Sequence, residues 1–162
     1  LRTAGFDPSP KALPIDDQLN QVFKREIDVQ KFRSYLETIE FSYGDVVSEP
    51  GNEQRMLYFI EQGTISIYLA ELDGKNHRIR SAGSGSMVGA ASFFRKGNMG
   101  ALVLGIADTE GTAHVMTESA FERMKSEDPE LFLSFQTFAL EYVSERLASN
   151  LRTLSSILRL EE

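Results

Sequence analysis

From Ile39 to about His114 the chain carries short apolar runs separated by glycines and other turn residues, whereas on both sides of this segment the apolar residues recur with helical spacing. Short strands with frequent turns are typical of an antiparallel sandwich or barrel. The spacing of apolar residues is thus helical, then strand-like, then helical again, which predicts a mainly β core with flanking helices. The length of 162 residues is enough for one domain with a substantial core.

Three turns of this central segment can be read from their residues. Tyr43-Gly44-Asp45 and Glu49-Pro50-Gly51-Asn52 combine residues that favour chain reversal. Ser84 stands between Gly83 and Gly85, which also indicates a turn. A Gly-x-Ser-x-Gly elbow for a catalytic nucleophile is not visible around this serine.

One hairpin is predicted within the same segment. Residues 64–69 alternate between apolar and polar side chains, and Asp73-Gly74 follows them with the pairing that a tight turn needs. Residues 76–81 are then the partner strand. Regular alternation places Arg78 and Arg80 on one face of that strand, where we expect contact with solvent; binding of an anion or of a partner's acidic groups is the alternative.

Helical patterns precede the sheet. Asp16 and Asp17 open one apolar-periodic stretch, and Asp28 is the expected cap of a second. Residues 1–14 contain three prolines and are interpreted as a linker, which leaves residues 15–158 as the domain. Because the chain begins at Leu1 rather than Met, we expect a fragment of a longer protein.

A long helix is expected at the other end. Thr117 can cap a short helix, and Asp128-Pro129-Glu130 then forms a strong helix start. The apolar stripe beyond it consists of Leu131, Phe135, Phe138, Tyr142, Leu147, Leu151, Leu154 and Leu158. The stripe is longer than a small barrel needs to cover. It therefore indicates a homodimer contact or a moving element, and a helix laid on the barrel is the alternative.

Composition excludes several classes of function. The net charge of -7 argues against a nucleic-acid surface, and the absence of cysteine excludes thiolate chemistry. Two histidines, His77 and His114, are too few for a cupin-type metal centre. His77 is expected on an exposed strand edge and His114 is expected to point outward. We predict no catalytic residues and no metal site.

The glycines and turns lie in the order found in cyclic-nucleotide-binding domains, which the chain resembles over residues 15–155. The matching positions are Gly44, Pro50-Gly51-Asn52, Leu57-Tyr58-Phe59-Ile60, Gly63, Gly74, Gly85, Gly89 and Asp128-Pro129-Glu130-Leu131. The resemblance implies a double-stranded β-helix, or jelly roll, with N-terminal helices and a long C-terminal helix. It also implies that Phe93 and Phe94 pack in the core rather than form an exposed docking pair.

The resemblance fails at the residues that hold the ligand. In the family, a Gly-Glu pair and an Arg some nine residues later bind the ribose and the cyclic phosphate; here those positions are Gly89-Ala90 and Met99. The expected pocket is therefore degenerate. It would be empty, filled by Met99 and its neighbours, or adapted to another ligand. The pocket residues that we predict are Gly89, Ala90, Ala91, Ser92, Met99, Gly100 and Ala101.

Two further expectations concern this pocket. Arg95 and Lys96 are the nearest cations in sequence, and we interpret them as part of a solvated loop, with a swing toward the pocket as the alternative. Phe138, Tyr142 and Leu147 are the expected lid. No cofactor is predicted, and binding of cyclic AMP or cyclic GMP is disfavoured.

The C-terminal part resembles a narrower group, the cyclic-nucleotide-binding-like tails of some bacterial SulP-type sulfate permeases. The residues concerned are Ser119–Met124, Glu127–Leu131, Ser144–Leu147 and Asn150–Leu154. This resemblance implies a non-enzymatic regulatory domain of an anion transporter, soluble and at the cytoplasmic face of the membrane, with the rest of the transporter chain as partner. The alternative is a working sensor of a cyclic nucleotide or another small phosphate ligand.

Overall fold

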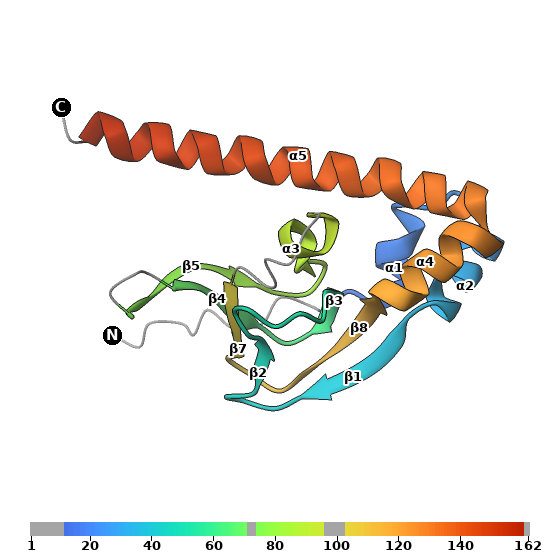
Figure 1. Cartoon of the computed structure of the whole chain (residues 1–162), viewed down its shortest axis with the longest axis horizontal. Coiled ribbons are helices and arrows are strands. Elements are labelled where there is room, and N and C mark those ends of the chain that lie inside the picture. Colours follow the sequence, from blue (N-terminus) through green and yellow to red (C-terminus); the bar gives the residue numbers. More distant parts are fainter. Residues whose placement is uncertain (1–11, 71–73, 96–102, 161–162) are drawn as a thin grey trace, which may run out of the picture.

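The computed structural model describes residues 12–70, 74–95 and 103–160 (Figure 1). Eleven residues of the expected linker, 1–11, therefore lie outside the described part of the chain. The elements in order are α1 (Ile15–Asn20), α2 (Glu26–Ser34), β1 (Glu37–Phe41), β2 (Val46–Ser48), β3 (Met56–Gln62), β4 (Ile65–Ala70), β5 (Asn76–Ala82), β6 (Met87–Val88), α3 (Ala90–Phe94), β7 (Val103–Ala107), β8 (Gly111–Thr117), α4 (Glu118–Glu127) and α5 (Pro129–Leu160).

The strands form two antiparallel sheets of four strands each. One sheet has the order β1-β8-β3-β6 and the other has the order β2-β7-β4-β5. The chain crosses from one sheet to the other at each connection except the β4–β5 hairpin, and helices cover one side of the resulting roll (Figure 1). The prediction of a mainly β jelly roll with N-terminal helices and a long C-terminal helix is confirmed.

The turn residues act as their chemistry predicts. Gly44, Gly51, Gly74 and Gly85 all have positive φ, between 78° and 85°. In the Ser84 turn the Ser86 N–H donates to the Gly83 carbonyl at 3.0 Å. The Ser84 hydroxyl also donates to the Glu61 carbonyl at 2.7 Å. Ser84 is therefore a structural residue of the turn.

Strand β3 is buried on both faces, which explains its continuous apolar sequence. Leu57 and Phe59 belong to the core under the helices, whereas Tyr58 and Ile60 belong to the core inside the roll. Successive side chains of a strand point to opposite faces, so an uninterrupted apolar run requires cover on both sides. Here one cover is the second sheet and the other is the layer of α1, α2, α4 and α5.

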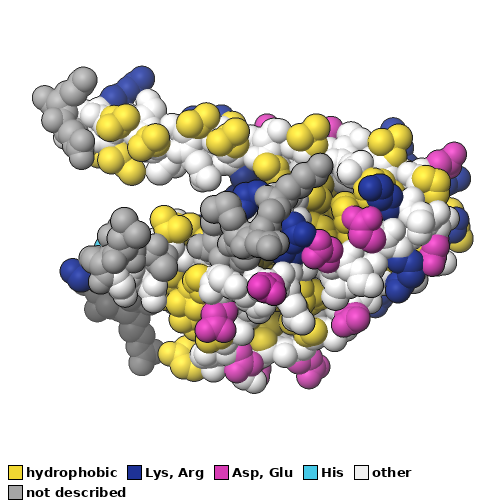
Figure 2. Space-filling model, viewed as in Figure 1, with side chains coloured by type: hydrophobic (Ala, Val, Ile, Leu, Met, Phe, Trp, Pro, Cys, Tyr) yellow, Lys and Arg dark blue, Asp and Glu magenta, His cyan; other side chains and the backbone are white. Residues whose placement is uncertain are grey.

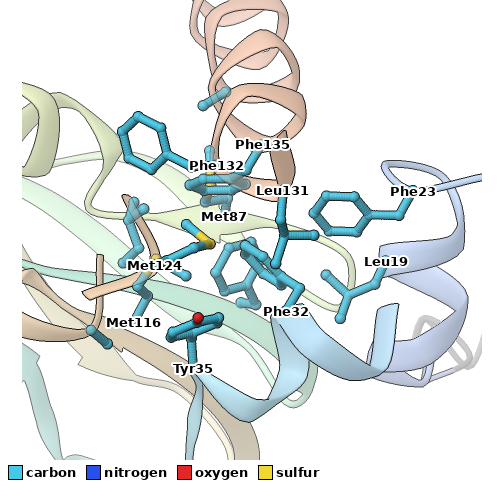
Figure 3. Packing of buried hydrophobic residues seen from close by; sticks show 14 of the residues in the cluster. Leu19, Phe23, Phe32, Tyr35, Met87, Met116, Met124, Leu131, Phe132 and Phe135 are labelled. Carbon is cyan, nitrogen blue, oxygen red and sulfur yellow. The ribbon is translucent and has the colours of Figure 1, made fainter. Parts of the chain in front are cut away.

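Aromatic rings fill the core beneath the helices (Figure 3). The Phe32 and Phe135 ring centroids are 4.8 Å apart, and Phe59 meets Phe32 edge to face at 5.9 Å. These rings come from α2, β3 and α5, so a single cluster joins three elements that are distant in sequence. Buried aromatic residues supply large apolar areas, and the cluster is the main attachment of α5 to the roll.

Phe93 and Phe94 join the edge of this cluster. Phe93 is buried and Phe94 is 36% exposed. Both rings contact Phe121 of α4, with centroid distances of 5.1 and 6.0 Å. The expectation of core packing is therefore confirmed for Phe93, while Phe94 lies at the boundary with solvent.

The capping predictions have mixed outcomes. The Thr117 hydroxyl accepts a hydrogen bond from the Ala120 N–H at 3.1 Å, so the predicted cap of α4 is confirmed. Asp28 was expected to cap α2, but it lies inside the helix and pairs with Arg25 at 2.8 Å. Asp128 accepts from the Tyr35 hydroxyl at 2.6 Å, so this carboxylate holds α2 against the α4–α5 junction.

His114 was expected to point outward, and this prediction is wrong. Its ring is 4% exposed, with Nε2 2.8 Å from a Glu61 carboxylate oxygen and Nδ1 3.1 Å from the Thr38 hydroxyl. Alternation does direct His114 away from the roll interior, but the helical layer covers that face too. Glu61 also accepts from the Ile15 N–H at 2.9 Å. The pair therefore ties the start of α1 to the sheet.

Helix α5 consists of two different halves. All four of its buried residues, Leu131, Phe132, Phe135 and Ala139, lie in the first half. In the second half, Leu147, Leu151, Leu154 and Leu158 are 52–59% exposed. Figure 1 shows this half running past the roll. No helix in the described residues combines the length and the apolar character needed to cross a membrane.

Candidate functional site

A pocket of about 190 Å³ lies where α5 passes over the roll. Strands β4 and β5, the β6–α3 junction, the start of β7 and the middle of α5 form its walls. The lining residues are Ile67, Ile79, Arg80, Met87, Val88, Gly89, Ala90, Ala91, Ser92, Val103, Tyr142, Val143, Arg146 and Asn150. Figure 2 shows the second half of α5 standing clear of the roll, with hydrophobic side chains along the helix.

Gly89 shapes the floor of the pocket. Its φ of 94° is in the left-handed region, and a Cβ atom there would collide with the Met56 carbonyl oxygen. Only glycine combines this conformation with so close an approach of two backbones. The Phe93 N–H donates to the Gly89 carbonyl at 2.9 Å, so a helical turn starts directly after the glycine. This turn is α3, which begins at Ala90.

Four of the predicted pocket residues are brought together: Gly89, Ala90, Ala91 and Ser92 all line the pocket. The other three, Met99, Gly100 and Ala101, lie outside the described residues, as does Lys96. Arg95 is half-buried, and it is not among the described residues that line the pocket. None of the described lining residues is acidic.

The predicted lid is correct in one residue of three. Tyr142 lines the pocket, whereas Phe138 packs beside Phe135 and Leu147 is 59% exposed. The residues of α5 that do line the pocket are Tyr142, Val143, Arg146 and Asn150. They lie at successive turns on one face of the helix, and of the apolar stripe on which the prediction was based they include only Tyr142.

Tyr142 fixes α5 to the pocket through the backbone of β6. Its hydroxyl accepts from the Met87 N–H and donates to the Met87 carbonyl, both at 3.1 Å. Strand β6 is an edge strand that pairs only with β3 among the described strands. One side chain therefore occupies both backbone groups of Met87 and marks the boundary between the two halves of α5.

A β-bulge places Arg80 in the pocket. Arg78 pairs with Tyr68 and Arg80 pairs with Ile67, so Ile79 is an additional residue on β5. Residues directly opposite in an antiparallel pair point to the same face, and Ile67 faces the roll interior with 1% exposure. The expectation that Arg78 and Arg80 share a solvated face is wrong, because the bulge turns Arg80 inward while Arg78 stays exposed.

Arg80 meets a second cation, Arg146 of α5. Partial burial lowers the pKa of Arg80, and the like charge of Arg146 lowers it further, while a hydrogen bond with Tyr142 opposes the shift. A guanidinium remains protonated at neutral pH even after such a shift. Two positive charges therefore face one small, partly apolar pocket. Sequence reasoning missed Arg146, although its position four residues after Tyr142 places it on the same face of a helix.

A second hollow is larger but offers less for a ligand. It has a volume of about 460 Å³ and lies between α2 and the start of α5. Its cations already pair with its acids, Arg25 with Asp28 at 2.8 Å and Lys31 with Asp128 at 3.6 Å. Within the described ranges, no three His, Asp or Glu side chains gather closely enough to hold a metal ion.

Comparison with known proteins agrees with the fold. Residues 38–128 match the model of the family described as "Cyclic nucleotide-binding domain". A cAMP-dependent protein kinase regulatory subunit from Debaryomyces hansenii is 25% identical over 136 residues, which are 82% of this chain. The chain spans only 27% of the length of that relative.

Solved structures show the same arrangement at lower identity. A cyclic nucleotide-binding domain from Methylobacillus flagellatus superimposes with a TM-score of 0.73 at 15% identity, covering 90% of this chain and 88% of the other. The c-di-GMP responsive regulator CLP of Xanthomonas campestris gives a TM-score of 0.69 at 19% identity, covering 81% of this chain and 63% of CLP. At such identities the similarity establishes the fold alone.

Proposed function

Because this chain belongs to the cyclic nucleotide-binding domain family, we propose that it is a non-enzymatic regulatory domain whose output is the position and association of α5. One observation carries the proposal: α5 closes the pocket with Tyr142 and Arg146 and then continues as a helix with exposed leucines. An occupant of the pocket would contact the helix directly. Any ligand that prefers one helix position then shifts the population of that position.

The cyclic-nucleotide site of this domain is degenerate. Ala90 begins α3, where the family resemblance implies a ribose-binding glutamate, and the described lining holds no carboxylate. Loss of one partner of a buried charge pair, as at Met99 where the family has an arginine for the phosphate, typically costs about 2 to 5 kcal/mol in binding. Titration calorimetry with cyclic AMP and cyclic GMP is expected to give no dissociation constant below about 100 μM for either nucleotide. Tighter binding would establish the alternative function, a cyclic-nucleotide sensor.

The second half of α5 is proposed to form a homodimer. Leu140, Leu147 and Leu154 recur at heptad spacing, and Leu151 and Leu158 supply the second position of the seam. All five are at least half exposed, which is unusual for a leucine row of this length. The pairing would bury this row between two copies of the helix.

Sedimentation equilibrium tests the dimer. The chain is expected to associate, and the double variant Leu147→Glu/Leu154→Glu is expected to be monomeric because the charges would face each other in the seam. Ile27→Glu, which changes an equally exposed apolar residue on α2, is the matched control and should not alter association. A wild-type monomer at concentrations of about 100 μM would exclude the dimer.

The proposed setting is an anion transporter of the SulP type, with this domain at the cytoplasmic face of the membrane and the rest of the transporter chain as partner. The support is the resemblance of residues 119–154 to the tails of such proteins, while the relatives and structures compared above are regulators and binding domains. The gene around this sequence provides the test. About ten apolar segments of about 20 residues each, encoded in the same reading frame, are expected. A gene without them would refute the transporter setting.

A further inference from the structure

Neither arginine of the pocket has a carboxylate partner among the described residues, although four other arginines of the domain do. Arg25, Arg33, Arg55 and Arg123 each pair with a carboxylate. Within the described part of the chain, neither Arg80 nor Arg146 forms an ion pair, and each lies near the other's positive charge. A half-buried pair of like charges is unfavourable unless something of opposite charge joins it.

The chain also provides a device that creates this pair. Without the bulge at Ile79, Arg80 would alternate onto the outer face with Arg78. The bulge instead directs both Ile79 and Arg80 to the pocket. Bulges are frequent next to functional sites, where they redirect a side chain. The backbone is thus arranged to bring a charge inward, toward the charge on α5.

We propose that this pocket binds a small organic phosphate monoester, with its phosphate between Arg80 and Arg146 and its apolar part against Ile67, Ile79 and Val143. A phosphate monoester carries a charge of about -1.5 to -2 at pH 7, which matches two guanidinium groups. Guanidinium groups also match phosphate oxygens geometrically, because each presents a fork of donors.

The size and lining of the pocket restrict the ligand further. A volume of about 190 Å³ is below the range of about 300 to 1,000 Å³ typical for drug-sized ligands. Apolar side chains from β4, β5, β7 and α5 form much of the wall. The Tyr142 hydroxyl and the Asn150 amide are the remaining polar side chains contributed by α5. A compact phosphate ester with a single ring or short chain fits these conditions better than a dinucleotide.

The two cations belong to different parts of the molecule, which links binding to regulation. Arg80 is on the roll and Arg146 is on α5. A phosphate between them replaces repulsion by attraction and draws the second half of α5 toward the sheet. This consequence rests on the proposed function of α5, whereas binding itself does not.

Titration calorimetry at low ionic strength tests the site with phenyl phosphate as probe. Wild-type chain is expected to bind it, and Arg80→Gln and Arg146→Gln are each expected to weaken binding at least about tenfold. The matched controls are Arg78→Gln on the same strand and Arg152→Gln on the same helix, which should bind like wild type. No binding of phenyl phosphate at about 10 mM, or binding by either pocket variant as tight as that of the wild type, would overturn the proposal.

Three further probes define the ligand class. Inorganic phosphate, which lacks the apolar part, and benzoate, which carries one charge, should both bind more weakly than phenyl phosphate; phenol should not bind. If inorganic phosphate binds as tightly as phenyl phosphate, the ligand does not need an organic group. If benzoate binds more tightly than phenyl phosphate, the site does not prefer a phosphate.

Thermal unfolding separates a ligand site from a structural role. Without phosphate, Arg146→Gln should melt at or above the wild-type temperature because a repulsion is removed. Phenyl phosphate should raise the melting temperature of the wild type by more than that of Arg146→Gln. A lower melting temperature for Arg146→Gln without ligand would contradict the proposal. If phenyl phosphate binds to a chain that stays monomeric, the proposed phosphate site stands and only the proposed α5 homodimer is refuted.

Discussion

The two halves of α5 have similar apolar content but opposite surroundings. From Pro129 to Ala139 the helix buries four residues, and its Phe135 ring lies within 6.5 Å of five other phenylalanine rings. Beyond Tyr142 every leucine is at least half exposed. The first half is held by the domain's own core, whereas the second half has apolar residues without a core in the described structure.

An apolar stripe on a helix therefore does not by itself predict burial. Both halves follow a helical period, yet only the first meets rings from α2, α4 and β3. Helical stability in proteins comes mainly from packing of such a face. The second half is therefore the part of the domain whose state can respond to a ligand or a second chain.

The largest effect is expected in the first half. Phe135→Ala should lower the free energy of unfolding by about 3 to 5 kcal/mol, because the ring is 1% exposed and its loss leaves a cavity at the centre of the cluster. Denaturant titration followed by circular dichroism measures the loss. Leu133→Ala, two residues away and 64% exposed, is the control and should change stability little. Similar losses for the two variants would contradict the assignment of this half as the anchor.

A smaller effect is expected at the boundary between the halves. Tyr142→Phe removes both hydrogen bonds to Met87 and should cost about 1 to 2 kcal/mol, with the ring packing against Phe138 retained. Amide hydrogen exchange should become faster from residue 142 onward and stay unchanged near Phe135. Tyr43→Phe, whose tyrosine is 81% exposed, provides the control. If the wild type and Tyr142→Phe both show the same exchange rates before and after residue 142, the helix has no boundary at this residue.

Acid should loosen the layer beneath the first half. Burial opposes ionisation of Glu61, but hydrogen bonds from the Ile15 N–H and His114 outweigh it and leave the Glu61 pKa below its ordinary value. The folded state thus holds this proton less well than the unfolded state. The stabilisation is present above the unfolded pKa of about 4.3 and is lost as pH falls through the lower folded pKa.

The variant Glu61→Gln isolates this contribution. At pH 7 it should be less stable by about 1 kcal/mol, a modest value because the carboxylate is partly exposed, and the gap should narrow toward pH 3. Urea titrations at several pH values measure it, with the exposed Glu37→Gln as control. A gap that is constant with pH would show that the Glu61 carboxylate has the same pKa in both states.

The smallest effect is expected at the end of α5. Leu158→Ala should change the free energy of unfolding of dilute chain by less than about 0.5 kcal/mol, because the side chain is 55% exposed. At higher concentration the same substitution should weaken association if the seam pairs. Unfolding measured across protein concentrations distinguishes the two regimes. A large loss in dilute chain would show that the second half packs on its own domain.

Much of the fold follows from local chemistry. The positive-φ glycines at the turns and the Thr117 cap were all predicted, because each depends on a few neighbouring residues. Gly89 was singled out by the family resemblance rather than by its local sequence. The structure gives the physical reason for a glycine there, which is its positive φ and its close approach to the Met56 backbone.

The features missed depend on distant parts of the chain. Regular alternation cannot foresee the bulge at Ile79, which is defined by pairing with β4, and so the inward direction of Arg80 was not predicted. His114 was predicted to point outward because strand alternation shows only that the face toward the roll interior is covered. The opposite face, where His114 lies, is covered by α1 and the other helices. The lid was misplaced in part for a similar reason, since only Tyr142 of the apolar stripe of α5 lines the pocket.

The Tyr142 hydroxyl has a consequence for solubility as well as for regulation. It occupies the outward N–H and C=O of Met87, at the free edge of a sheet. Such edges are templates on which another chain can add a strand, and proteins usually block them. Movement of α5 away from the roll would expose this edge. The helix thus protects the domain against self-templated aggregation, and any signal that releases it must leave the strand shielded in another way.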